Sequence, residues 1–172
     1  TMSVAQRLYE SGRITYMRTD STQLSKMALA SAKKIISESF GAQYSKTRQY
    51  ATRSKGAQEA HEAIRPTFME ETKIEGTATE KKLYELIWKR TMACQMADAE
   101  LEKTIAKIEI STNREELTAS GEVLKFDGFL KVYREDKDDD ELEEEANEGM
   151  LPPLTVGQQL PLKEMKATER FS

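Results

Sequence analysis

A tyrosine and an arginine two positions apart, Tyr16 and Arg18, could perform nucleophilic chemistry on a phosphate. If residues 13–18 form a β-strand, alternate side chains share a face, so the phenol and the guanidinium point the same way. Only ~0.1% of tyrosine is ionised at neutral pH, so a nucleophilic tyrosine needs nearby positive charge or a base. Arg18 supplies that charge and can bind two phosphate oxygens at once. The alternative is a tyrosine that packs and an arginine that stays solvated.

A second group of such residues lies in the segment 57–67, which contains the only histidine, His61, and Arg65 four residues later. If this segment forms a helical turn, the two side chains share a face, and Pro66 ends the turn. A single histidine is more often a surface or structural residue than a catalytic one. The spacing alone therefore leaves both roles open.

Both segments resemble motifs of one protein family. The run from Ile14 to Ser21, Ile-Thr-Tyr-Met-Arg-Thr-Asp-Ser, resembles the active-site tyrosine motif of type IA DNA topoisomerases, in particular the bacterial topoisomerase I branch. The run from Ala57 to Thr67, Ala-Gln-Glu-Ala-His-Glu-Ala-Ile-Arg-Pro-Thr, is similar to the histidine-containing segment of the same family. Weaker similarity continues through residues 83–96, 126–133 and 151–153.

The resemblance implies a mechanism for the parent enzyme. Tyr16 would attack a single-strand phosphodiester, leaving a 5′-phosphotyrosyl bond and a free 3′-hydroxyl, and a second strand would pass before religation without ATP. Arg18 would stabilise charge on the phosphoryl oxygens, and His61 and Arg65 would hold the flanking phosphates. Asp20 is a further candidate phosphate-binding residue. Negatively supercoiled DNA would be relaxed.

The resemblance also implies a fold class and partners. We expect an α+β chain, with a helical tyrosine-bearing domain at 1–97 and a β-rich arch segment at 98–172, excised from a toroidal multidomain enzyme. Mg²⁺ would bind to a TOPRIM domain outside this chain, which itself would bind no metal or cofactor. The expected partners are single-stranded DNA and the remaining domains of the same polypeptide. A monomer is expected, and the chain alone should be inactive.

The distribution of charge agrees with a phosphate-binding function. The chain of 172 residues has a net charge of −4. Residues 135–148, however, hold ten acids and one lysine, which indicates a mobile acidic insertion. Residues 1–67 hold eleven lysines and arginines against five acids. Positive charge therefore gathers around both motifs, as contacts with a nucleic-acid backbone require.

The segment 41–57 contains no acid and combines cations with Tyr44 and Tyr50. Such a combination suits a single nucleic-acid strand, because cations follow the backbone and aromatic rings stack on unpaired bases. A solvated loop is the alternative. We predict DNA contacts for Arg48, Arg53 and Lys55.

Hydrophobic periodicity and capping residues predict the elements that position these residues. Asp20 with Gln23, and Thr77 with Glu80, are typical of helix starts. Alternating patterns predict strands. The expected helices are 4–11, 20–40 and 77–96, with Leu86 among the core residues of the last, and the expected strands are 13–18, 106–110, 117–125 and 158–167.

Composition excludes several classes of protein. No apolar run approaches the ~20 residues that span a bilayer, and the start of the chain lacks a signal-peptide pattern, so a cytoplasmic location is expected. The resemblance implies that this location is the bacterial nucleoid. A single cysteine, Cys94, excludes an internal disulfide and a cysteine zinc finger within this sequence.

Two other functions remain open at this stage. The chain could be a non-catalytic single-stranded DNA-binding module that only grips phosphate. It could also be a structural domain that docks onto a partner through the acidic residues 135–148.

Overall fold

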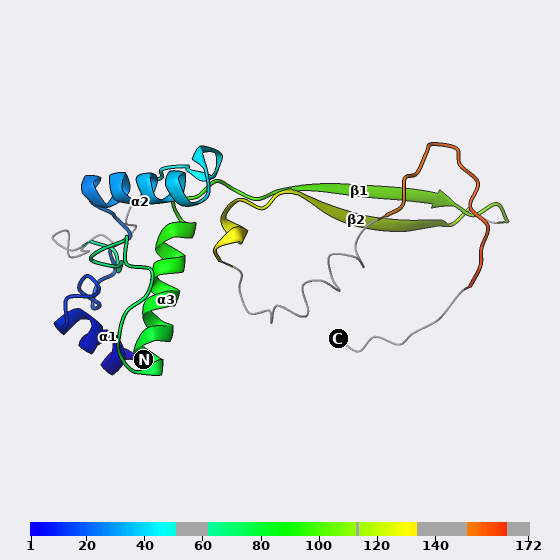
Figure 1. The fold of residues 1–172 in the computed structure, drawn as a ribbon. Coiled ribbons are helices and arrows are strands. Elements are labelled where there is room, and N and C mark those ends of the chain that lie inside the picture. The colour runs from blue at the N-terminus through cyan, green and yellow to red at the C-terminus, as the bar shows by residue number, and fades with distance from the viewer. Residues whose placement is uncertain (51–61, 113, 134–150, 165–172) are drawn as a thin grey trace. The chain divides into compact units, whose positions relative to one another are not determined.

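The computed structural model describes residues 1–50, 62–112, 114–133 and 151–164 (Figure 1). The described part combines helices with a two-stranded sheet, which confirms the predicted mixture of helix and strand. In chain order the elements are α1 (Met2–Glu10), α2 (Lys26–Ser39), η1 (Ala42–Tyr44), α3 (Ala78–Ala93), β1 (Glu100–Glu109), β2 (Glu116–Phe126) and η2 (Gly128–Lys131).

The chain divides into two compact units. The first comprises Thr1–Leu101 with Leu124–Asp138, and the second comprises Glu102–Val123 with Asp139–Ser172. All three α-helices belong to the first unit. The predicted domain boundary at residue 97 stays a prediction.

Helix α3 is the central element of the first unit. It begins with the predicted capping box, in which Thr77 accepts from the Glu80 N–H and the Glu80 carboxylate accepts from the Thr77 N–H. Its buried face carries Tyr84, Thr91 and Met92. The prediction that Leu86 faces the core is wrong, because two residues turn a helix by about 200° and so place Leu86 opposite Tyr84, where it is exposed.

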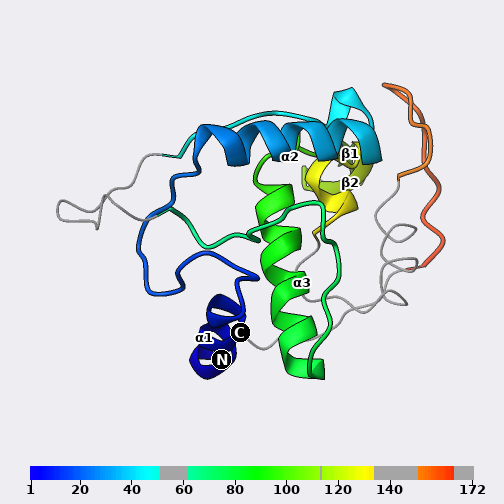
Figure 2. The same cartoon turned by 60° about the vertical axis from the view of Figure 1, so that its left-hand side comes forward.

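Two hydrophobic clusters pack around α3. One joins α2 to α3 through Ala32, Ile36 and Met92. The other joins α1 to α3 through Leu8 and Tyr84, and also includes Ile14 and Met17 from the tyrosine segment. Figure 2 shows α1 beside one end of α3 and α2 across the other. The residues around Tyr16 are thus part of a core.

Helix α2 begins later than predicted. Its cap is Ser25, whose hydroxyl accepts from the Ala28 N–H, so the predicted start at Asp20 is wrong. Hydroxyl groups satisfy the preceding backbone locally, since Thr19 accepts from the Ser21 N–H and Ser21 accepts from the Gln23 N–H. Such local bonds compete with helix formation. The predicted end before Gly41 is confirmed.

The two predicted strands at 106–110 and 117–125 are confirmed by β1 and β2, which form one sheet. The predicted strand at 158–167 is wrong for residues 158–164, which form no regular structure, and residues 165–167 lie outside the described part.

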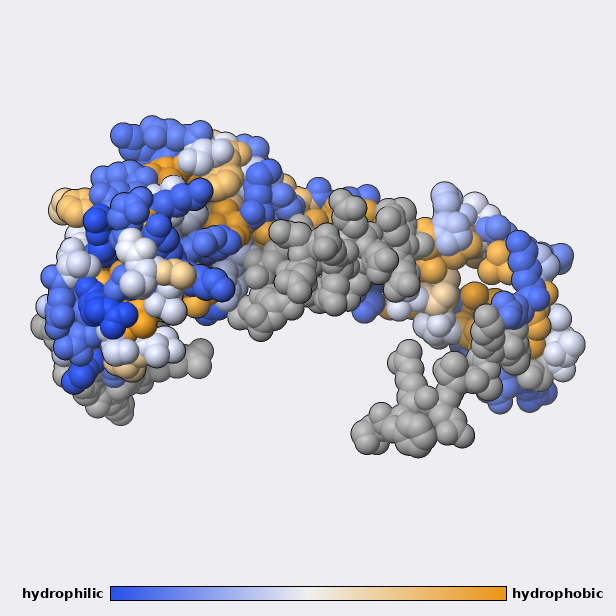
Figure 3. Space-filling model, turned by 60° about the horizontal axis from the view of Figure 1, so that its bottom comes forward, coloured by the Kyte–Doolittle hydropathy of each residue, from blue (hydrophilic) through white to orange (hydrophobic). Residues whose placement is uncertain are grey.

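Hydrophilic residues, in blue, cover much of the surface in Figure 3, and hydrophobic ones, in orange, reach it in several places. None of the described helices is both long and apolar enough to cross a membrane.

Candidate functional site

The segments that carry the two motifs lie side by side. Ile14 and Pro66 form an antiparallel bridge, flanked by two backbone hydrogen bonds. The Thr15 N–H donates to the Arg65 carbonyl at 2.9 Å, and the Thr67 N–H donates to the Arg13 carbonyl at 2.9 Å. Ile14 is 2% exposed, so this pairing is anchored in the core. Residues some fifty positions apart are therefore held in register.

The side chain of Thr15 ends this pairing. In a continuing ladder the Arg65 N–H would donate to the Thr15 carbonyl. Here it donates to the Thr15 hydroxyl at 2.9 Å, and that hydroxyl donates to the Ala63 carbonyl at 2.8 Å. The predicted strand at 13–18 is therefore wrong: only Ile14 makes a bridge, because a side chain replaces the backbone partner.

Tyr16 follows directly after this contact and is half-buried. Its ring packs against the cluster that contains Ile14 and Met17. It also meets the ring of Tyr9 edge-on, with the ring centroids 5.2 Å apart and the planes at 71°. The phenol ring is thus neither fully buried in the core nor free of packing.

Arg18 and Asp20 are both exposed. Because the strand ends at Thr15, alternation of faces no longer places Arg18 beside Tyr16. Met17 between them is buried, and this fixes the local path of the chain. The two polar side chains consequently extend from a segment whose backbone is held on one side by the core.

Arg65 is held within its own segment. Its guanidinium forms an ion pair with Glu62 through Nε at 3.0 Å and Nη2 at 2.5 Å, and Nη1 donates to the Pro66 carbonyl at 2.9 Å. The Arg65 side chain is only 16% exposed. Residues 62–67 are not helical, so the described part of this segment lacks the helical turn that would place His61 and Arg65 on one face. Through its bond to the Pro66 carbonyl, Arg65 therefore helps to hold the backbone that pairs with the Tyr16 segment.

Glu62 connects this arginine to helix α2. One of its carboxylate oxygens accepts from the Ser25 N–H at 2.6 Å, at the helix cap, while the other binds Arg65. Burial raises the pKa of Glu62, but the hydrogen bonds from Ser25 and Arg65 outweigh it, so the pKa lies below its ordinary value of 4.5. The lowered pKa favours the ionised carboxylate where it joins the cap of α2 to the segment 62–67.

Arg48 is also engaged by the protein. Its guanidinium donates to the carbonyls of Cys94 and Met96, just after α3, and to Asp98 at 2.6 Å. The predicted DNA contact of Arg48 stays a prediction. In the structure, its guanidinium binds backbone carbonyls at the end of α3 that have no partner within the helix. Three further predicted site residues, His61, Arg53 and Lys55, lie outside the described residues.

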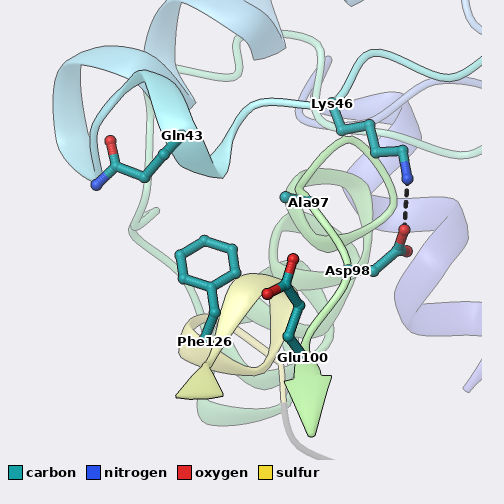
Figure 4. A pocket seen from close by; sticks show the side chains of 6 residues that line it. All are labelled: Gln43, Lys46, Ala97, Asp98, Glu100 and Phe126. Atoms are coloured by element: carbon teal, nitrogen blue, oxygen red, sulfur yellow. Dashed lines mark hydrogen bonds and ion pairs between the residues drawn. The ribbon is translucent and has the colours of Figure 1, made fainter. Parts of the chain in front are cut away.

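A surface pocket of ≈ 440 Å³ lies away from Tyr16, near the start of β1 (Figure 4). Lys46 reaches across one side of it to Asp98 at 2.5 Å. Its other lining residues are Gln43, Ala97, Glu100 and Phe126. Because Asp98 and Glu100 balance the charge of Lys46, the pocket offers no concentrated positive charge for a phosphate.

Sequence reasoning missed Thr15, Glu62 and Tyr9 as residues that position the site. Glu62 had a signal, because an acid three residues before an arginine can pair with it locally. Thr15 and Tyr9 act through contacts that spacing does not reveal. No group of three His, Cys, Asp or Glu side chains in the described part could hold a metal ion.

Comparison with known proteins gives consistent matches over the whole chain. The sequence model of a family described as "DNA topoisomerase" matches residues 1–172. DNA topoisomerase 1 of Zymomonas mobilis is 44% identical over 176 residues, which covers 100% of this chain and 14% of that protein. DNA topoisomerase 1 of Synechocystis is 46% identical over 162 residues, which covers 91% of this chain and 18% of that protein.

A solved structure, full-length topoisomerase I from Thermotoga maritima, is similar with a TM-score of 0.64 and 36% identity. The similarity covers 79% of this chain and 23% of that one. The chain thus spans less than a quarter of the length of each of these three proteins.

We predict that Thr15→Val destabilises the protein by roughly 1–3 kcal/mol, because the Ala63 carbonyl and the Arg65 N–H lose their partner while the shape of the side chain is kept. Thr15→Ser retains the hydroxyl and should lose much less. Urea unfolding of both variants measures the difference. Equal stability of the valine and serine variants would show that the hydroxyl does not hold the two segments together.

We predict that Glu62→Gln lowers the free energy of unfolding by about 1–2 kcal/mol at pH 7, because charge-assisted bonds become neutral ones. Since the folded pKa is lowered, the carboxylate's contribution is present above pH 4.5 and is lost as the pH falls through the folded pKa. The difference in melting temperature between wild type and variant should therefore shrink in acid. A difference that stays constant from pH 7 to pH 3 would contradict this.

Proposed function

The chain belongs to the bacterial DNA topoisomerase family, and on that basis we propose that it is the tyrosine-bearing part of a longer type IA enzyme. The complete enzyme relaxes negatively supercoiled DNA by cutting one strand, passing another through the gap and resealing the cut. The observation that carries the proposal is the pairing of the Tyr16 segment with the segment of Arg65.

In the proposed reaction the phenolic oxygen of Tyr16 attacks a backbone phosphorus in line with the departing 3′ oxygen. The new bond joins the phenol to the 5′-phosphate, the phenolic proton is lost, and the 3′ oxygen takes up a proton to become a hydroxyl. The reverse attack by that hydroxyl restores the phosphodiester and frees Tyr16. No phosphoanhydride is consumed, because the covalent bond to Tyr16 conserves the energy of the broken one.

Neighbouring groups have distinct roles in this proposal. Arg18, which is exposed, binds the phosphoryl oxygens and stabilises the charge that develops on them. Arg65 acts by orienting Pro66 and Thr67, to whose carbonyls its guanidinium donates. His61 is proposed to hold a flanking phosphate. Asp20, Arg48, Arg53 and Lys55 are proposed as further contacts along the strand.

The remaining parts of the proposal concern regions outside this chain. Mg²⁺ is assigned to another domain of the same polypeptide, and that domain and this one together form a toroid around DNA. In this scheme the enzyme works as a monomer in the cytoplasm, at the nucleoid. The high share of cations among residues 1–67 supports the assignment of DNA as the partner.

We predict that Tyr16→Phe in the complete enzyme abolishes the covalent DNA adduct and relaxation, while affinity for single-stranded DNA changes less than about threefold, since only a hydroxyl is lost. Denaturing gel electrophoresis with a labelled oligonucleotide measures the adduct. Tyr50→Phe, which removes the hydroxyl of an exposed tyrosine outside both motifs, is the matched control. Relaxation that survives Tyr16→Phe would rule Tyr16 out as the nucleophile. A wild-type enzyme that binds DNA but forms no adduct would favour a non-catalytic binding module.

We predict that the 172-residue chain alone binds single-stranded DNA weakly and forms little or no adduct in the presence of Mg²⁺. The reason is that the proposed metal-binding domain and much of the DNA path lie elsewhere. Fluorescence anisotropy gives the affinity, and the denaturing gel gives the adduct. Efficient adduct formation by the isolated chain would contradict the proposal that the reaction also requires the metal-binding domain.

A further inference from the structure

We infer that Tyr9 is a positioning residue for Tyr16: its ring fixes the orientation of the phenol that attacks the phosphate. The inference rests on the proposed function and adds a residue that lies outside both motifs. Tyr9 belongs to the last turn of α1 and precedes Tyr16 by seven residues.

The two rings meet in a favourable geometry. Their centroids are 5.2 Å apart and their planes form an angle of 71°, so one ring presents its edge to the other. Aromatic pairs prefer this arrangement, because the positive edge of one ring faces the negative face of the other. A swing of the Tyr16 ring about its Cα–Cβ bond would break the contact, so the contact restricts where the phenolic oxygen lies.

Tyr9 is 42% exposed, but the backbone that carries it is held by hydrogen bonds. Its carbonyl accepts from the Gly12 N–H at 2.8 Å, and the neighbouring Leu8 carbonyl accepts from the Arg13 N–H at 2.8 Å. Leu8 is 2% exposed and lies in the same cluster as Ile14. Gly12, at φ +71°, permits the tight turn between helix and bridge. The backbone that carries Tyr9 is therefore tied to the backbone that leads to Tyr16.

Tyr16 needs such support from side chains. Its backbone leaves the pairing at Thr15, and residues 16–25 belong to no helix or strand. Packing against the ring of Tyr9 and against the cluster around Met17 therefore contributes to the orientation of the Tyr16 ring. Attack in line with the leaving oxygen tolerates little misorientation, so loosening one of these contacts should slow the chemical step.

The test compares Tyr9→Leu with Tyr9→Phe in the complete enzyme. The leucine variant loses the aromatic ring, whereas the phenylalanine variant keeps the ring and loses only the hydroxyl. We expect Tyr9→Leu to slow adduct formation on a saturating single-stranded oligonucleotide by roughly two- to tenfold, with the affinity for the oligonucleotide unchanged within twofold. Tyr9→Phe should react at the wild-type rate.

Three results would overturn the inference. These are a wild-type rate for Tyr9→Leu, an equal loss in both variants, and a loss of affinity with an unchanged rate at saturation. A wild-type rate for Tyr9→Leu would show that the ring contact does not affect the reaction. An equal loss in both variants would assign the effect to the hydroxyl. A loss of affinity alone would make Tyr9 a DNA contact. Tyr16→Phe, measured alongside, distinguishes a failure of this inference from a failure of the proposed function. An adduct formed by that variant would refute the proposed function itself.

Discussion

The hydroxyl of Thr15 is the contact on which the candidate site depends. It accepts from the Arg65 N–H and donates to the Ala63 carbonyl, and so joins two segments that are far apart in sequence. By taking the place of the backbone carbonyl it also stops the ladder at one bridge. Tyr16 thereby leaves the paired backbone and is half-buried against side chains, with Tyr9 and the core around Met17 to orient it.

Several arginines of the first unit form ion pairs or hydrogen bonds with the protein's own acids and carbonyls. Arg65 is bound by Glu62, Arg13 by Glu71, and Arg48 by Asp98 and the carbonyls after α3. Arginines held in this way order the backbone, and the exposed Arg18 differs from them in extending into solvent. In the described part of this unit, the backbone around these three arginines is thus held by the protein's own contacts without a nucleic acid.

Local signals in the sequence predicted local structure well. The start of α3 follows from Thr77 and Glu80, and the strands follow from alternation, because each pattern acts over a few residues. The start of α2 was predicted wrongly, because local hydroxyl groups bind the preceding backbone and Glu62 binds the N–H of the Ser25 cap. The path of residues 13–18 was predicted wrongly, because it depends on pairing with residues 65–67 that no local pattern encodes. Resemblance identified the motif residues, whereas Thr15, Glu62 and Tyr9 emerged only from the structure.

The most direct test of this account is amide hydrogen exchange, measured by NMR on the 172-residue chain. The N–H groups of Thr15, Arg65 and Thr67 make the bonds that join the two segments. If the segments form one unit with the core, all three should be protected and should open with a common free energy, close to that of the Met92 amide in α3. Exchange of these three amides at the rates of an unstructured peptide, with Met92 still protected, would contradict the account.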